Sequence, residues 1–242
     1  MILAEVRPRS VTEIIDATFN FYRGSFATCI ALTMIILGPP AVLKVIVPAS
    51  WQRIVEIGEN FLVPIATGAI AAVVISVLER NESPNVASAL QRISGRQWTL
   101  IGIQFLSGVM ILAGLILLVV PGVIAMVWTA VSIPSAIAEG FGAVRAIGRS
   151  RRLVRGRWGA ALGTLILSWG LTFLLMVGVS VVVGMLDLSE RAIAVCTDMC
   201  FIALLPIPAI GLTLLYYDLR IRAEGADIEA MASALPNTTP AT

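Results

Sequence analysis

The chain of 242 residues contains no histidine and only one lysine, Lys44. Without histidine there is no Ser-His or Cys-His dyad, no HExxH zinc motif and no histidine acid–base step. The sequence also lacks a G-x-S-x-G elbow and a GK[ST] phosphate loop. The three cysteines lie in apolar runs, which is typical of small buried residues rather than disulfides. These absences indicate a protein that is not an enzyme and uses no cofactor.

Charge is scarce as well, because charged residues make up 13% of the chain, against about 25% in an average soluble domain. Hydrophobic residues make up 58%, and the mean hydropathy is +0.93. A globule of this size cannot bury so much apolar surface, so lipid is the expected solvent. The composition predicts an all-α polytopic integral membrane protein. We expect about six transmembrane helices, with amphipathic interfacial helices on the cytoplasmic side.

Six apolar runs approach or exceed the roughly 20 residues that a helix needs to cross a bilayer. They cover residues 26–47, 61–78, 99–120, 123–138, 159–185 and 193–217. A tight turn at Pro121-Gly122 is expected to join the third and fourth runs into a hairpin. Pro206-Ile207-Pro208 is expected to kink the sixth run near its middle. The small-residue motifs at 159–163 and 180–184 are expected to pack helices against each other within the chain.

The basic residues are distributed very unevenly between the segments that separate these runs. Fourteen of the seventeen lie in segments 1–25, 79–98 and 139–158 and in the C-terminal segment. Only Lys44, Arg53 and Arg191 fall on the other side. The positive-inside rule therefore places both termini in the cytoplasm, and an even number of crossings agrees with this orientation. The first ten residues have no apolar core, so they are not expected to be a cleavable signal peptide.

Three of the basic segments are expected to form helices that lie on the membrane. The first begins with Ser10-Val11-Thr12-Glu13, which is a capping box. Each ends with a glycine and an arginine just before an aromatic residue, and the glycines (Gly24, Gly95 and Gly156) are expected in the left-handed conformation that stops a helix. The pattern predicts one domain, residues 1–230, built of three loose units at about 10–78, 83–138 and 140–217. Residues 231–242 are expected to form a flexible tail. The alternative is that any surface helix entering a bilayer needs such an ending.

The arginine-rich segment before the fifth run is the strongest candidate for a binding site. Arg145, Arg149 and Arg152 share one helix face, and Arg151 and Arg155 share a neighbouring one. Basic residues beside an anionic leaflet contribute about 1 kcal/mol each, and arginine binds phosphate through two parallel hydrogen bonds. The alternative is a topology signal whose arginines pair with nearby acids, such as Glu139 and those of the C-terminal segment.

The candidate lipid- or partner-binding residues come from this segment and the C-terminal one. They are Arg145, Arg149, Arg151, Arg152, Arg155, Arg157, Trp158, Tyr217, Asp218, Arg220, Arg222 and Glu224. The expected partners are the lipid bilayer, with anionic phospholipid, and a second membrane protein. Nucleic acid is not expected, because the segment lies against the bilayer and the net charge is only +2.

Asp198 motivates a second function, that of a small transporter or channel, because an acid inside a membrane helix is costly unless it is paired or hydrated. The kinked sixth run would supply the discontinuous helix that many transporter sites use. The alternative is a residue within reach of the outer interface, paired with Arg191 or Arg53. Lys44 lies at the outer end of the first run, where snorkelling to the interface explains it.

Two motifs connect the chain to a known family. One is Glu139-Gly140 followed by residues 149–156 and Trp158, and the other covers residues 216–222 with Glu224-Gly225 and Asp227. Together with the opening helix at 10–23 and the Val120-Pro121-Gly122 turn, they resemble the glycerophosphoryl diester phosphodiesterase membrane domain, a bacterial family. The resemblance covers nearly the whole chain.

The resemblance implies the membrane module alone, in the bacterial inner (plasma) membrane. In fused members of that family, catalysis belongs to a separate soluble barrel that depends on histidines and on a metal held by acids. This chain has no histidine and no room for a barrel, so no catalytic residue carries over.

Overall fold

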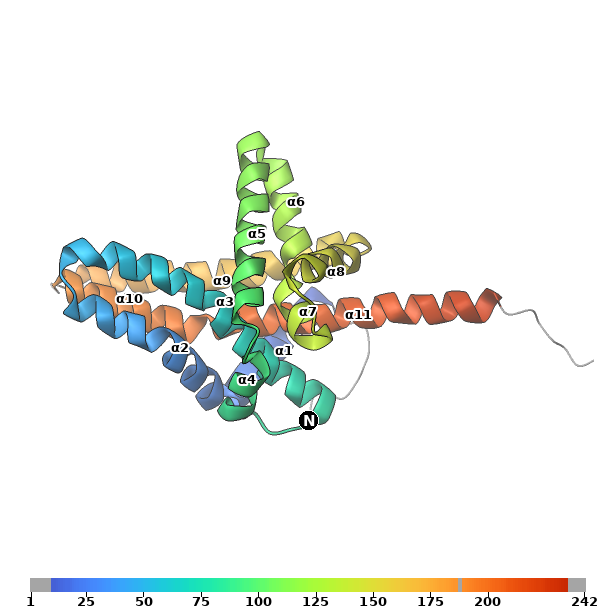
Figure 1. Cartoon of the computed structure of the whole chain (residues 1–242), viewed down its shortest axis with the longest axis horizontal. Helices are drawn as coiled ribbons and strands as arrows, with labels where there is room; N and C mark the ends of the chain where they lie inside the picture. Colours follow the sequence, from blue (N-terminus) through green and yellow to red (C-terminus); the bar gives the residue numbers. More distant parts are fainter. Residues whose placement is uncertain (1–9, 187–188, 235–242) are drawn as a thin grey trace, which may run out of the picture.

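The computed structural model describes residues 10–186 and 189–234, with the side chains of residues 49, 190 and 226–234 left out. Within these ranges the chain forms helices and no strand (Figure 1). The helices are α1 (Val11–Gly24), α2 (Phe26–Ile46), α3 (Ala49–Arg80), α4 (Val86–Ile93), α5 (Gln97–Leu117), α6 (Val119–Thr129), α7 (Ser132–Glu139), α8 (Ala143–Arg155), α9 (Trp158–Met185), α10 (Glu190–Leu204) and α11 (Pro206–Ala234).

Six helical segments in the described ranges are long and apolar enough to cross a membrane. They are Phe26–Ile46, Ser50–Arg80, Gln97–Leu117, Val119–Glu139, Trp158–Met185 and Arg191–Gly225. Each overlaps one of the six apolar runs, so the expected class of all-α, multi-pass membrane protein is confirmed. The second segment begins well before residue 61, because residues 49–60 continue the helix with polar side chains that a hydropathy criterion passes over.

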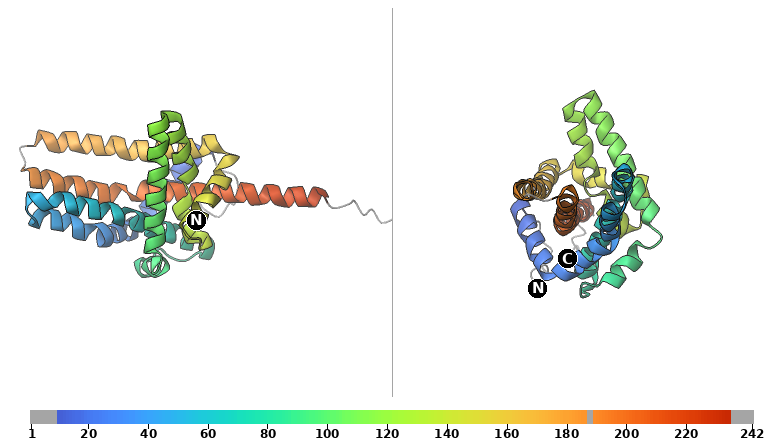
Figure 2. Two further views of the ribbon diagram at one scale, coloured as in Figure 1. Left: turned by 45° about the horizontal axis from the view of Figure 1, so that its top comes forward. Right: turned by 90° about the vertical axis from the view of Figure 1, so that its left-hand side faces the viewer.

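Helix α11 lies at the centre of the fold. Down the long axis of the molecule it is surrounded by other helices (Figure 2), and it contacts α1, α3 and α9 among others. Ile210, Leu214, Leu215 and Tyr216 on this helix are fully or almost fully buried. Close approach requires a glycine, because a Cβ at Gly211 would lie 2.8 Å from the Ser168 Oγ of α9. Small residues allow the backbones of membrane helices to come together in this way.

The α5–α6 hairpin has an unexpected direction. Helices α2, α3, α9 and α10 run side by side, whereas the hairpin stands across them in all three views (Figures 1 and 2). It is held at its base, where Leu100 and Ile103 are buried, and its far end around Leu117 and Val120 is exposed. Helices that cross a flat bilayer run near its normal. The hairpin and the four-helix bundle as described therefore do not both run along the normal of one flat bilayer.

The hairpin turn lies closer to the N-terminus than expected. The residue between α5 and α6 is Leu118, with extended backbone, while Pro121 and Gly122 belong to the first turn of α6. The prediction of a Pro121-Gly122 turn was therefore wrong, because a proline in the first helical turn gives up an N–H that has no helical partner anyway. The glycines instead let the two helices touch: a Cβ at Gly114 would lie 2.7 Å from the Gly122 amide nitrogen.

The helix boundaries confirm one expected signal and correct another. The capping box is present, since Ser10 Oγ accepts from the Glu13 N–H at 3.3 Å and the Ser10 N–H donates to Glu13 Oε2 at 2.8 Å. Of the three glycines expected to be left-handed, only Gly95 is, with φ of 78°. Gly156 is right-handed and Gly24 has no positive φ. The described left-handed residues at other helix ends are Asn81 and Gly140.

The sixth apolar run divides into α10 and α11 at Leu205, next to Pro206 and Pro208. The expected interruption is therefore present, as a junction between two helices. Proline has no N–H to donate, so carbonyls before the junction need other partners. Tyr22 Oη of α1 donates to the Ala203 carbonyl at 2.6 Å. Burial, with the nearby Cys29 thiol, raises the pKa of Tyr22 to about 12, so the phenol keeps its proton.

Each surface helix packs one side against other helices and exposes the other side. The buried side of α1, with Ile14 and Thr18, packs against α9 and α11. Helix α4 packs against α3, and α8 against α5, α6 and α7. At the other end of the chain α11 continues to Ala234, into the region expected to be a tail, while residues 235–242 lie outside the described residues.

The close contact at Gly211 leads to a prediction about stability. Replacing Gly211 by Leu should lower the free energy of unfolding in detergent by about 1–3 kcal/mol, because the side chain would be forced against Ser168 and Thr18. Gly170→Leu on α9 is the control, since a Cβ there meets no atom within 4 Å. Circular dichroism during denaturation measures both variants, and equal stability of the two would contradict the packing described.

Candidate functional site

The first candidate site is built around the carboxylate of Glu139, at the end of α7. Its Oε1 accepts from Arg149 Nε of α8 at 2.8 Å and from Tyr216 Oη of α11 at 2.7 Å. Glu139 is followed by Gly140, which is left-handed with φ of 73° and ends the helix. Burial alone would lower the pKa of Arg149, but its hydrogen bond and ion pair with Glu139 raise it overall. One carboxylate thus joins three helices.

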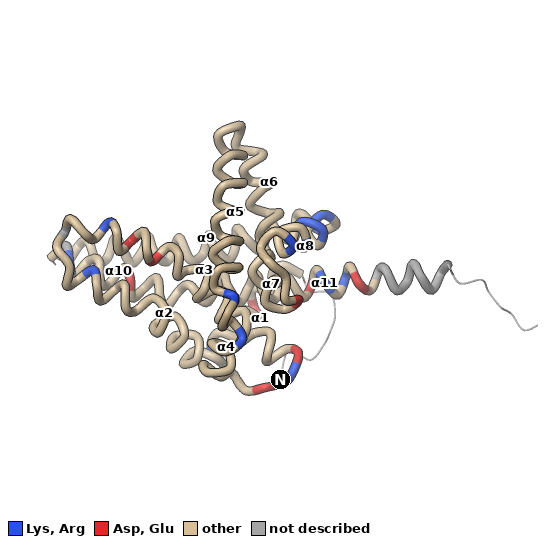
Figure 3. Tube along the Cα trace, viewed as in Figure 1, with Lys and Arg blue, Asp and Glu red and all other residues tan. Residues whose placement is uncertain are grey.

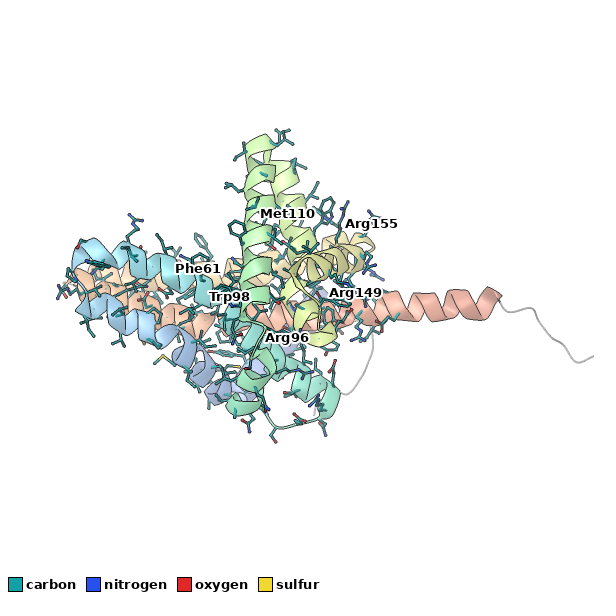
Figure 4. All side chains as sticks on the ribbon, in the orientation of Figure 1. Phe61, Arg96, Trp98, Met110, Arg149 and Arg155 are labelled. Atoms are coloured by element: carbon teal, nitrogen blue, oxygen red, sulfur yellow. The ribbon has the colours of Figure 1, made fainter. Side chains whose placement is uncertain are left out.

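The same network continues along α11. Arg149 Nη2 also donates to Glu224 Oε1 at 3.1 Å, and Arg220 Nε donates to that oxygen at 2.9 Å. The Arg220 guanidinium lies 3.5 Å from the Tyr216 hydroxyl. Arg149, labelled in Figure 4, therefore lies between two carboxylates from different helices, as in the alternative in which the arginines pair with nearby acids.

A second polar contact ties α11 to α3 and α4. Tyr217 Oη donates to Glu79 Oε1 at 2.6 Å, and Arg92 Nη2 lies 3.4 Å from Glu79 Oε2. Arg222 Nε donates to Asp218 Oδ2 at 2.9 Å within α11, where Asp218 is buried. These contacts give Tyr217, Asp218, Arg220, Arg222 and Glu224 structural partners inside the fold. The side chain of Asp227, part of the second motif, lies outside the described residues.

Four arginines of α8 are arranged differently. Arg145, Arg151, Arg152 and Arg155 are exposed and line one open groove of about 550 Å³. In the part of the chain that the structure describes, none of the four forms an ion pair with an acid. Figure 3 shows the basic residues of α8 gathered on its outer side, and Figure 4 places Arg155 at its outer end. We call this surface the arginine groove.

Aromatic rings hold two of these guanidinium groups in place. Arg151 lies over the ring of Trp128 on α6, 4.1 Å from its centroid, and Arg145 lies 5.3 Å from the centroid of Phe141. A cation over an aromatic face is attracted by about 0.5–1 kcal/mol at an exposed site. Such stacking leaves the guanidinium N–H groups free to donate. Of the remaining candidates, Arg157 is exposed beyond the groove and Trp158 packs against the core.

The second candidate site surrounds Asp198. Lys44 Nζ of α2 donates to both carboxylate oxygens of Asp198 on α10, at 2.9 and 3.0 Å, and also pairs with Glu59 of α3. The three side chains are only 10–15% exposed. The expected pairing of Asp198 with Arg191 or Arg53 was therefore wrong, and Lys44 reaches across the bundle instead of snorkelling outward.

A cavity of about 230 Å³ opens beside this triad, with Gln52, Glu56 and Arg191 among its other lining residues. Its lining includes Ala41, which belongs to an apolar cluster with Leu37, Ala66, Ile202 and Leu205. All five of these residues are almost completely buried. The cavity therefore borders an apolar layer in the conformation described.

Sequence reasoning missed two acids that join helices, Glu59 beside Asp198 and Glu79 beside Tyr217. Glu59 and Glu79 received no role, although each accepts a charge-assisted or phenolic hydrogen bond from another helix. The sequence did contain a sign of their role, because both acids lie in α3, which is long and apolar enough to span a membrane. An acid in such a helix needs a partner. Their partners lie on other helices, so spacing along the chain does not identify them.

Comparison with protein families, with curated proteins and with solved structures finds no match to this chain.

The triad leads to a prediction about stability. Lys44→Met should lower the free energy of unfolding by about 2–4 kcal/mol, because it leaves two poorly hydrated carboxylates without a cation. Arg53→Met, at an exposed position, is the matched control. Adding Glu59→Gln and Asp198→Asn to Lys44→Met should restore most of the loss, since no unpaired charge then remains. The idea fails if Lys44→Met unfolds like the control.

Proposed function

We propose that this protein is a non-enzymatic protein of the bacterial inner membrane that binds the phosphate headgroup of anionic phospholipid in the arginine groove of α8. The observation that carries the proposal is the division of the arginines on one helix. Arg149 is neutralised by Glu139 and Glu224, whereas the four arginines of the groove have no described acid beside them. Like charges held together repel one another, so a bound anion would stabilise them.

Headgroup phosphate matches the chemistry of the groove. Guanidinium groups bind phosphate oxygens through paired N–H donors, and they are more weakly hydrated than ammonium groups. Val144 and Phe141 line the groove beside the arginines and provide an apolar wall. A membrane-protein partner with an acidic segment would be the other occupant, and the experiment below separates the two.

The charge distribution supports an orientation with the groove at the cytoplasmic face. Basic residues gather around α4, α8 and the middle of α11, and few lie at the far end of the bundle (Figure 3). A hairpin begins and ends on the same side, so the direction of α5–α6 does not alter this assignment. The motif at 149–156, on which the resemblance to the glycerophosphoryl diester phosphodiesterase membrane domain partly rests, contains three of the four arginines of the groove.

The test compares two pairs of exposed arginines. Arg151→Gln with Arg152→Gln should weaken binding of phosphatidylglycerol about 30-fold, from about 1 kcal/mol for each basic residue. Arg80→Gln with Arg157→Gln removes the same charge outside the groove and should change binding severalfold less. Native mass spectrometry of the protein extracted in mild detergent, followed by lipid titration, measures both.

Two outcomes would contradict lipid binding. Equal affinity in the two double variants would show that only total charge matters, and a co-purifying protein in place of lipid would identify the other occupant. Arg149→Gln completes the design, because its loss should lower stability and leave headgroup affinity nearly unchanged.

A second candidate function, transport of a small solute, is favoured by the triad and the cavity beside it. With the apolar layer at Leu37 and Ile202 beside the open cavity, this would be the form of such a site that is open to one side of the membrane only. Asp198→Asn should then abolish flux in proteoliposomes, while Arg53→Met should leave it unchanged. Absence of flux by the wild-type protein across charged and zwitterionic solutes would exclude this function.

A further inference from the structure

A second cavity, of about 220 Å³, lies in the angle between the crosswise hairpin and the bundle (Figure 1). It is lined from α3, α5, α6, α7, α9 and α11, mostly by apolar side chains such as Ile111, Met126 and Leu165. A few residues with polar groups interrupt this lining, namely Thr67, Gln104, Ser107, Thr129 and Thr213. We call this cavity the hairpin crevice. An apolar cavity with a small number of polar groups is the usual form of a ligand site.

One of the polar groups has no partner within the protein. The Oγ atom of Ser107 is buried and makes no hydrogen bond in the described structure. The hydroxyls of the three threonines in the lining each donate to a backbone carbonyl: Thr67 to Val63 at 3.1 Å, Thr129 to Ala125 at 3.0 Å and Thr213 to Ala209 at 2.7 Å. A buried hydroxyl without a partner is unfavourable. Ser107 is therefore suited to donate to an acceptor, such as an ester carbonyl, that enters the crevice.

The crevice and the arginine groove are neighbours across the junction of α6 and α7. The Arg151 guanidinium stacks on the ring of Trp128. The next two residues of the chain, Thr129 and Ala130, line the crevice. The Val131 N–H receives support from α8, where Ser150 Oγ accepts from it at 3.2 Å. A phosphate in the groove would thus lie about one helix diameter, about 10–12 Å, from the crevice.

We propose that the hairpin crevice holds an acyl chain of the same phospholipid whose phosphate occupies the arginine groove, with an ester carbonyl accepting from Ser107. This inference rests on the proposed headgroup function and adds the class of ligand: a diacyl phospholipid rather than free phosphate or a soluble phosphate ester. Figure 1 shows α8 and the four-helix bundle on opposite sides of the hairpin. A lipid with its headgroup at α8 and its chain toward the bundle has the orientation of the cytoplasmic leaflet.

Gly108 provides a direct test, because it lines the crevice and a Cβ added there meets no atom within 4 Å. Gly108→Leu fills the space without a clash. Gly178→Leu is the matched control, an exposed glycine of α9 that also has open space around it and does not line the crevice. Both changes add the same apolar side chain to a membrane helix.

The ligands are palmitoyl-oleoyl phosphatidylglycerol, dihexanoyl phosphatidylglycerol and inorganic phosphate, each titrated against the full chain in detergent. The control should prefer the long-chain lipid, with each buried methylene worth about fourfold in affinity. Gly108→Leu should lose at least about tenfold of long-chain affinity and keep the short-chain affinity of the control. Ser107→Ala, which removes the hydroxyl without adding bulk, should weaken the long-chain lipid about three- to tenfold.

The results separate failure of the inference from failure of the proposed function. The crevice proposal is overturned if Gly108→Leu and Ser107→Ala both keep the long-chain preference of the control. In that case, loss of short-chain binding in the Arg151→Gln, Arg152→Gln protein would still support the headgroup function. Unchanged short-chain binding in that double variant would remove the headgroup function and the inference with it. Inorganic phosphate binding as tightly as the long-chain lipid would overturn the inference by itself.

Discussion

The arrangement of the basic end of the protein depends on one carboxylate, that of Glu139. It accepts from Arg149 of α8 and from Tyr216 of α11, and so fixes the rotation of α8 about its own axis. Arg149 lies at the edge of the buried side of α8, which consists of Ala146, Ser150, Leu153 and Val154. The arginines farther round the helix, Arg145, Arg151, Arg152 and Arg155, are exposed and line the groove. The internal ion pair and the open arginine groove therefore lie side by side on one helix. Glu139 is the last residue of α7, next to the left-handed Gly140. From this position its carboxylate reaches both Arg149 of α8 and Tyr216 of α11.

Much of the fold followed from hydropathy and helix-end chemistry. The six apolar runs and the capping box at Ser10 are in place, because both depend on residues close together in the chain. The errors have local causes as well. Residues 49–60 extend α3 although they alternate charged and polar residues with apolar ones, and α6 begins before Pro121 because the first helical turn tolerates proline. Only the crosswise direction of the α5–α6 hairpin is purely tertiary: a hairpin apolar on all sides carries no pattern that specifies how it leans on its neighbours.

For the candidate sites, the sequence shows which residues are present but not which of them come together in the fold. The density of arginine in α8 was visible in the sequence, but which arginines pair inward depends on acids 10 and 75 residues away. Lys44 and Asp198 are 154 residues apart. Spacing rules reach only to neighbouring turns of one helix. Gly211 illustrates the same limit for packing, since the recognisable motif at 159–163 has open space or ordinary contacts while an isolated glycine makes the close approach.

The two candidate functions differ in whether the helices of the bundle must move. A transport site at Lys44 and Asp198 requires the apolar layer at Leu37 and Ile202 to open, so that α2, α3 and α10 must move relative to one another. Lipid binding at α8 requires no such movement, because the groove is open as described. The close packing of α11 against α9 opposes movement, since Gly211 and Ser168 leave no room for a shift of the central helix. A rigid core with an open basic surface is better suited to holding a lipid than to alternating access.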